Sequence, residues 1–337
     1  PTDFSLRCDD AESQESFDPN IDYRKEMPKL LLEKDGLQLW HKMDRTFRVP
    51  RTSLRLLLTS PDVYRSPKSM TLMRIFGKIL DDDLNSYIYD ASLAGCRARV
   101  TCLPTGISIS VNGYSEKLPH LLDVVTGRML SIIDEMKQAD EASGLHLKFD
   151  KAKKNLLRET KNFRLESPYE TASYISRVLL EHNVWHVSNY INEMEGDYAE
   201  KNPLSLYDCA VIAEESLTQR LLATFLCMGN IDEKGAHEVV KLIEKNFLKS
   251  SRALSQEEIP KLRSMKMPTK EEATQIFGPG VKGMKIPLKI EEMNYSESEE
   301  NHAVEVIMQC GAEFEMGYEG VAILELIGQI AYNSAYN

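Results

Sequence analysis

Two long stretches of the chain repeat apolar residues every three or four positions, a pattern that predicts helices with one buried face. They cover residues 73–91 and 118–136. Their apolar positions are Met73, Phe76, Leu80, Leu84, Tyr87 and Ala91, and then Leu118, Leu122, Val125, Met129, Ile132 and Met136. Gly95 stands where a C-capping glycine would end the first helix.

Shorter apolar repeats predict further helices. They lie at residues 149–157, 168–179, 204–220, 239–247 and 319–337. Asp232 is a suitable N-cap for the helix at 239–247. The helix at 319–337 is followed by neither a capping glycine nor a proline, so we expect the chain to be cut within a domain.

Clusters of aliphatic residues between glycines and prolines predict strands. These strands are expected at residues 37–40, 47–49, 54–58, 221–228, 286–292 and 303–310, with a hairpin over 96–111 that turns at 104–106. The mixture of segregated strands and helices predicts an α+β fold with an antiparallel-rich sheet packed against helices.

The distribution of prolines, glycines and apolar runs divides the chain into parts. We expect a linker or wrapped arm over 1–28, a domain over 29–249, an interdomain linker over 250–285 and the beginning of a second domain over 286–337. The order of strand, gap and long helix occurs at 53–85 and again at 303–337. We therefore expect the second domain to be a truncated copy of the first.

Composition narrows the classes of partner. Lys and Arg number 41 against 52 Asp and Glu, for a formal net charge of -11, and no basic stripe interleaved with aromatics is present. This disfavours nucleic acid and anionic membranes as partners. The six cysteines are scattered without a C-x-x-C pair, which favours a reduced, cytoplasmic setting.

The most suggestive candidate for chemistry is EHNVWH, where His182 and His186 are spaced for one face of a helix. Zincin motifs need a glutamate at the position of Asn183 or of Trp185. The general base is absent in both readings, so we expect structural or surface histidines, with a weak metal pair as the alternative.

Other short motifs also favour structural roles. The segment at 277–285 resembles a phosphate loop but lacks its Lys-Ser/Thr ending, and GISIS at 106–110 lacks the second glycine of a nucleophile elbow. Asp81, Asp82 and Asp83 point in different directions on a helix, which predicts a solvated face. From the residues alone we predict no catalytic residue and no metal ligand in this chain.

Several blocks resemble the C-terminal half of the insulysin group of the pitrilysin family of zinc metalloproteases. They are LQLWHKMDRTFRVPR (37–51), LNSYIYDASLAG (84–95), ISISVNGYSEKLP (107–119), NFRLESPYE (162–170) and MGNI (228–231). Their order and spacing resemble the family over most of residues 30–337. The stretches 137–147 and 194–202 depart from it.

The resemblance implies a third domain and the start of a fourth in a protease built from four homologous domains, whose halves enclose a peptide. It implies a catalytic zinc held by an N-terminal half absent from this chain. It also implies a substrate-binding Arg and Tyr in the fourth domain, just beyond Asn337. Tyr336 is the candidate substrate contact closest to that segment, with a packing role as the alternative.

The implied function is that of a noncatalytic, chamber-forming half of a zinc metalloendopeptidase, inactive alone. The implied partners are the N-terminal catalytic half of the same polypeptide, peptide substrates and a homo-oligomeric copy. One alternative is an inactive scaffold or binding subunit of the same fold, as in the core proteins of respiratory complexes. Another is a small hydrolase that uses His182 and His186.

Overall fold

The computed structural model describes residues 4–9, 18, 20–181, 184–249, 251–259, 301–305 and 313–335. Their contacts divide the chain into two compact units, each described by itself below. The first unit contains Pro1–Glu166 and Arg177–Ser264, and the second contains Ser167–Ser176 and Met265–Asn337. The domain boundaries expected from the sequence stay predictions, because most of residues 250–312 lie outside the described part.

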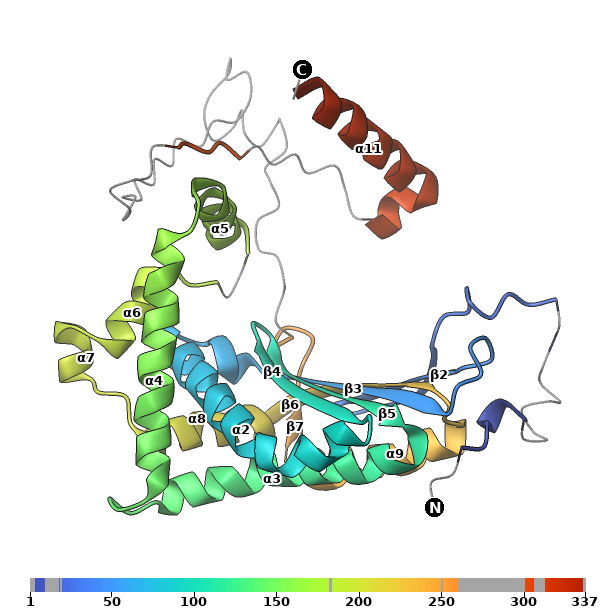
Figure 1. The fold of residues 1–337 in the computed structure, drawn as a ribbon, viewed down its shortest axis with the longest axis horizontal. Helices are drawn as coiled ribbons and strands as arrows, with labels where there is room; N and C mark the ends of the chain where they lie inside the picture. Colours follow the sequence, from blue (N-terminus) through green and yellow to red (C-terminus); the bar gives the residue numbers. More distant parts are fainter. Residues whose placement is uncertain are drawn as a thin grey trace. The chain divides into compact units, whose positions relative to one another are not determined.

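The first unit is built on one twisted sheet (Figure 1). Its strands are β1 (Lys29–Lys34), β2 (Leu37–Met43), β3 (Arg51–Thr59), β4 (Arg97–Leu103), β5 (Gly106–Tyr114), β6 (Arg220–Gly229) and the two-residue β7 (Arg252–Ala253). The order across the sheet is β1-β2-β6-β3-β5-β4, and β7 pairs with β6. β6 runs parallel to β2 and antiparallel to β3, and the β1–β2, β3–β5 and β4–β5 pairs are antiparallel. The prediction of an antiparallel-rich sheet is confirmed.

Helices cover one face of this sheet (Figure 1). They are α2 (Pro67–Leu93), α3 (Leu118–Gln138), α8 (Leu206–Thr218) and α9 (Glu233–Ile243). Alternate strand residues such as Leu56, Ile109 and Phe225 point into the core between these layers and are at most 1% exposed. Complete burial of an aliphatic or aromatic side chain contributes about 1.5–3 kcal/mol, so this interface holds the unit together.

The ends of α2 and α9 follow the chemistry expected from the sequence. Gly95 has φ +79, and the amides of Gly95 and Cys96 donate to the carbonyls of Ser92 and Ala91 at 3.0 and 2.8 Å. This is a Schellman cap, which glycine favours because its φ is positive. At the other helix, Asp232 Oδ1 accepts a hydrogen bond from the Gly235 amide at 2.6 Å.

The predicted hairpin is formed by β4 and β5, which pair from Leu103 opposite Gly106 to Arg97 opposite Asn112. Gly106 lies where β5 passes close to β3, and a Cβ there would overlap the carbonyl oxygen of Leu58. GISIS is therefore a strand that fits tightly against its neighbour, as the sequence predicts.

Three local predictions need correction. Residues 47–49 form no strand, since Asp44 Oδ1 accepts hydrogen bonds from the amides of Thr46 and Phe47 and closes a turn. The strand β1 was not predicted, because most of its residues are exposed and show no alternation. The helix expected over 204–220 is α8, which begins at Leu206 and ends at Thr218.

Beyond one end of the sheet lie α4 (Gly144–Asn162), α6 (Val187–Met194) and α7 (Asp197–Lys201), and α5 (Pro168–Leu180) spans the border of the two units (Figure 1).

α6 buries a carboxylate. Glu193 is 7% exposed, and its Oε2 atom has no hydrogen-bond partner among the described residues. Burial raises the pKa of Glu193, and the charge of Lys68 opposes this rise.

Glu193→Gln is expected to raise the free energy of unfolding at neutral pH by about 1 kcal/mol, since a buried unsatisfied charge is replaced by a neutral group. A group with a raised native pKa destabilises the native state above that pKa and has no such effect below the unfolded value. The gain should therefore shrink as pH falls through the raised native pKa towards the ordinary glutamate pKa of 4.5. Urea unfolding of the unsubstituted chain and of the Glu193→Gln variant across this pH range measures the gain in the free energy of unfolding. The exposed Glu200→Gln is the control, and equal gains from both variants would contradict the prediction.

In the second unit the structure describes α11 (Glu313–Ala335), which is interrupted by the non-helical Gly317. The helix predicted over 319–337 is thus present in its described residues. Its apolar side chains are exposed, with Ile323 at 52%, Ile327 at 55% and Ile330 at 59%. The strand predicted at 286–292 lies outside the described residues, and so does 306–310, while residues 303–305 form no strand. None of the helices in the described part of the chain is both long and apolar enough to cross a membrane.

Candidate functional site

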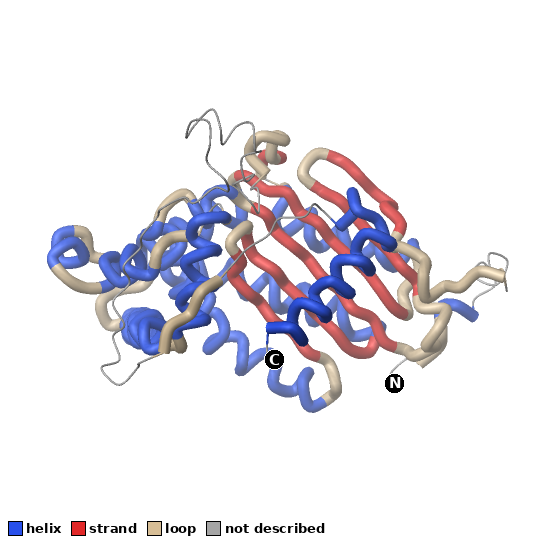
Figure 2. Tube along the Cα trace, turned by 90° about the horizontal axis from the view of Figure 1, so that it is seen from above, coloured by secondary structure: helices blue, strands red, loops and turns tan. Residues whose placement is uncertain are grey.

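The sheet of the first unit has an open face, which we define as the face opposite α2, α3, α8 and α9. Figure 2 looks onto this face. The strand register aligns its side chains in rows that run across β2, β6, β3, β5 and β4. The rows are Trp40-Leu226-Arg55-Ser110-Arg99, Lys42-Met228-Ser53-Asn112-Arg97 and Gln38-Thr224-Leu57-Ser108-Thr101.

The half of the open face on β2 and β6 carries apolar side chains beside Gln38, Lys42 and Thr224. Trp40 on β2 and Leu226 and Met228 on β6 are half-buried, as is Leu57 on β3. A sheet with one covered face usually places polar residues on the other. Apolar side chains here therefore indicate a surface that contacts something besides water.

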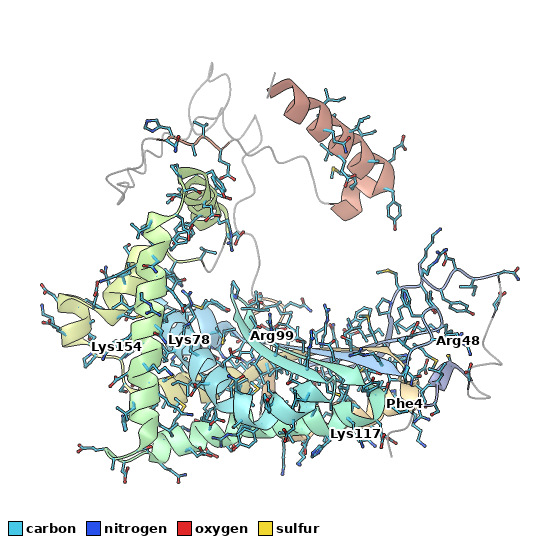
Figure 3. The ribbon with its side chains drawn as sticks, in the orientation of Figure 1. Phe4, Arg48, Lys78, Arg99, Lys117 and Lys154 are labelled. Atoms are coloured by element: carbon cyan, nitrogen blue, oxygen red, sulfur yellow. The ribbon has the colours of Figure 1, made fainter. Side chains whose placement is uncertain are left out.

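The other half of the open face is basic. Arg55 on β3 and Arg97 and Arg99 on β4 are exposed, and we refer to them as the arginine cluster. Figure 3 labels Arg99, on the side of β4 away from α3. No hydrogen bond or ion pair joins the side chain of any of the three to another residue in the described part of the chain. Ser108, Ser110 and Asn112 of β5 lie between Arg55 and β4 on this face, and none of the described rows contains a carboxylate.

Of the histidine pair, only His186 lies among the described residues. His186 caps the N-terminus of α6, where its Nδ1 accepts from the Ser188 amide at 3.3 Å and lies 2.7 Å from the Ser188 hydroxyl. This gives His186 a structural role, as the sequence favours. His182 lies outside the described residues.

The described part of the chain contains no group of three or more His, Cys, Asp or Glu side chains placed to hold a metal ion. Among its cysteines, burial raises the pKa of Cys102 and of Cys227 to about 12. A thiol with such a pKa stays protonated and is a poor nucleophile near neutral pH.

The three consecutive aspartates of α2 differ in exposure, because successive positions on a helix point in different directions. Asp81 and Asp82 are exposed, as predicted, but a solvated position is wrong for Asp83, whose side chain is only 12% exposed. Arg128 of α3 reaches Asp83 with two hydrogen bonds at 2.5 and 2.9 Å. The triplet therefore contains a helix-to-helix ion pair and no cation site.

The N-terminal arm lies against the first unit. The amide of Arg7 donates to Asn230 Oδ1 at 2.6 Å, and the Asn230 side chain donates to the Ser5 carbonyl at 2.8 Å. Beside it is a cavity of about 490 Å³, lined among others by Glu116, Lys234 and Glu238. The mixed charges of this cavity favour no single ligand class.

Tyr336 and the segment at 277–285 lie outside the described residues, so Tyr336 as a substrate contact stays a prediction. The arginine cluster was missed from the sequence. Its signal is the alternation RARVT at 97–101, where basic residues occupy every second position of a strand.

The chain is similar in sequence to a known protein family and to several curated proteins. The sequence profile described as the middle or third domain of peptidase M16 matches residues 1–193. The insulin-degrading enzyme of Drosophila melanogaster is 28% identical over 213 residues, which cover 63% of this chain and 20% of that protein. A nardilysin-like protein of Arabidopsis thaliana is 25% identical over 338 residues, covering 100% of this chain and 29% of that protein.

Among solved structures, the crystal structure of pitrilysin superimposes with a TM-score of 0.58 at 16% identity, covering 73% of this chain and 23% of that one. This likeness confirms the α+β fold. The chain spans only 20% to 29% of the length of the two curated relatives named above.

Proposed function

Because the chain belongs to the peptidase M16 family, whose middle or third domain its residues 1–193 match, we propose that it forms a noncatalytic wall of a peptide-degrading zinc metallopeptidase. The observation that carries the proposal is the open face of the sheet. It carries apolar side chains on β2 and β6 and arginines on β3 and β4, and a peptide held beside it would meet both kinds of side chain. The relatives' names, insulin-degrading enzyme and nardilysin-like, support a peptidase as the parent protein.

In this proposal the catalytic zinc is bound by another part of the parent polypeptide. The sequence contains no H-x-x-E-H motif, and the described residues do not provide a ligand set. We therefore assign the zinc, when bound, to an N-terminal half of the parent polypeptide, where it would polarise the scissile carbonyl and activate water. This chain would bind and enclose the peptide and contribute no zinc ligand.

The second unit is proposed to be the beginning of a further domain of the same kind. In support, α11 exposes Ile323 and Ile327 on one apolar side. Such a helix face is normally buried against a sheet or another helix. Residues of a longer polypeptide would provide that cover.

The test compares cleavage of fluorogenic peptides by this chain and by the longer polypeptide that contains it. We expect cleavage by the longer polypeptide alone, and a metal chelator should stop it. Cleavage by the 337-residue chain that His182→Ala abolishes would contradict the proposal. A longer polypeptide that binds peptides but never cuts them would favour the scaffold.

A further inference from the structure

β4 forms one edge of the sheet. Among the described residues it is the last strand in the order and pairs only with β5, with all residues of Arg97–Leu103 in continuous register. No other hydrogen bond engages its outward backbone groups in the described part of the chain. Such an edge is a template for an added strand.

The opposite edge of the sheet is better protected. β1 has a register shift between Leu30 and Leu32 and carries lysines at both ends, Lys29 and Lys34. A bulge and terminal lysines are devices that prevent strand addition. The two edges therefore differ, and β4 is the regular one.

The side chains of β4 specify what could add to it. Arg97, Arg99 and Thr101 are exposed on the open face, whereas Ala98, Val100 and Cys102 are half-buried on the other face. Cys102 Sγ donates to the Met73 carbonyl of α2 at 3.3 Å, which fixes the direction of that second face. An added strand would thus meet positive charge on one side and apolar surface on the other.

Within the described part of the chain, the side chains of Arg97 and Arg99 differ from most arginines in having no carboxylate partner. Carboxylates pair with many of the other arginines, namely Arg24, Arg48, Arg65, Arg128, Arg177, Arg220 and Arg252. The chain has an excess of acidic residues, 52 against 41 basic ones. Two neighbouring arginines on β4, with Arg55 two strands away on the same face, therefore favour an anionic partner at this edge.

We propose that the β4 edge binds an extended acidic peptide by strand addition, with carboxylates at alternate peptide positions opposite Arg97 and Arg99. Residues two apart on a strand are separated by about 6.6–6.8 Å, so glutamates at positions i and i+2 match the two arginines. Directly opposed side chains on neighbouring strands have Cβ atoms about 4.5–5.5 Å apart. The intervening peptide residue faces the side of Ala98 and Val100 and should be apolar.

The two arginines also disfavour a second copy of this chain as the occupant. Two β4 edges placed side by side would bring like charges together on one face, which is destabilising. An acidic peptide relieves the repulsion between Arg97 and Arg99, whereas a neutral peptide does not. The identification of this peptide as a substrate segment rests on the proposed function, but the binding itself does not.

The test measures binding to the 337-residue chain by fluorescence anisotropy, with a labelled short peptide whose centre reads Glu-Val-Glu. Matched peptides read Gln-Val-Gln and Val-Glu-Glu, the second with the same charge in adjacent positions. The alternating acidic peptide should bind tightest. Replacing Arg97→Ala and Arg99→Ala together should weaken it by about two- to thirtyfold, and more salt should reduce the difference.

The control variant carries Lys154→Ala and Lys201→Ala, which remove the same charge from exposed positions of α4 and α7 and should leave binding unchanged. Arg97→Glu with Arg99→Glu should reverse the preference towards a Lys-Val-Lys peptide, an outcome that misfolding cannot produce. Equal binding of the Glu-Val-Glu and Val-Glu-Glu peptides would overturn the proposal, and so would equal losses in the arginine and lysine variants. Because no cleavage is measured, failure here is distinct from failure of the proposed function.

Discussion

Phe225→Ala is expected to destabilise the first unit by about 3–5 kcal/mol, the usual cost of removing a fully buried aromatic side chain. Phe225 is 0% exposed. It lies on β6, at the centre of the sheet, directly between Leu39 of β2 and Leu56 of β3. The cavity would open where the sheet meets its helices, and neighbouring strands hold the backbone too firmly to collapse into it.

Urea unfolding monitored by tryptophan fluorescence measures this loss. The chain contains two tryptophans, and both Trp40 and Trp185 belong to the first unit. The control is Leu226→Ala, the next residue on β6, whose side chain is half-buried on the open face. We expect it to cost no more than about 1 kcal/mol, since less apolar area is removed from contact. Equal losses for Phe225→Ala and Leu226→Ala would show that the sheet is not covered on one face only.

Features of the fold that depend on nearby residues could be predicted from the sequence. The periodicity of α2 and α3, the cap at Gly95 and the N-cap at Asp232 each involve positions within a few residues of one another. The β4–β5 hairpin is equally local. Such elements are encoded by spacing and by the conformational preferences of single residue types.

Features that depend on distant residues could not be predicted in this way. Nothing in residues 220–229 indicates that β6 lies between β2 and β3, because that place is decided by pairing across long stretches of chain. β1 was missed because it pairs at the exposed rim of the sheet, where burial does not impose alternation. The error at residues 47–49 arose from the Asp44 turn, in which a side chain competes with strand pairing for the backbone amides.

The candidate site also combines features that depend on nearby residues with features that depend on distant ones. Of the short motifs weighed in the sequence, His186 caps a helix and GISIS is a strand, whereas His182 and the segment at 277–285 lie outside the described residues. The open face was not found, because its rows combine residues from β2 to β4 that only the folded register aligns. A binding surface made by a sheet is therefore poorly visible in a sequence that has no short motif to mark it.

The ion pair between α2 and α3 provides the second large effect. Arg128 and Asp83 are 13% and 12% exposed, and Arg128 also donates to both carboxylate oxygens of Glu135. Its guanidinium lies 5.4 Å from the centre of the Tyr87 ring. Hydrogen bonds with Asp83 and Glu135 raise the pKa of Arg128, so the group remains charged at every accessible pH.

Arg128→Ala is expected to reduce the free energy of unfolding of the first unit by about 2–4 kcal/mol. Breaking a buried ion pair costs about 3–5 kcal/mol because one charge is left without its partner. Lys148, whose Nζ lies 3.9 Å from Asp83 Oδ1, should recover part of that loss. The same urea unfolding, followed by the tryptophan signal, gives the value.

A double-mutant cycle separates the loss of the ion pair from the cost of a stranded carboxylate. Asp83→Asn combined with Arg128→Met removes both charges and keeps the volume of both side chains, so the double variant should be more stable than Arg128→Ala. The surface pair of Arg177 and Glu181, which is 57% and 31% exposed, is the control, and Arg177→Ala should cost less than about 1 kcal/mol. If Arg128→Ala and Arg177→Ala had the same small effect, the contact between α2 and α3 would depend on apolar packing alone, and Asp83 would be as solvated as its neighbours Asp81 and Asp82.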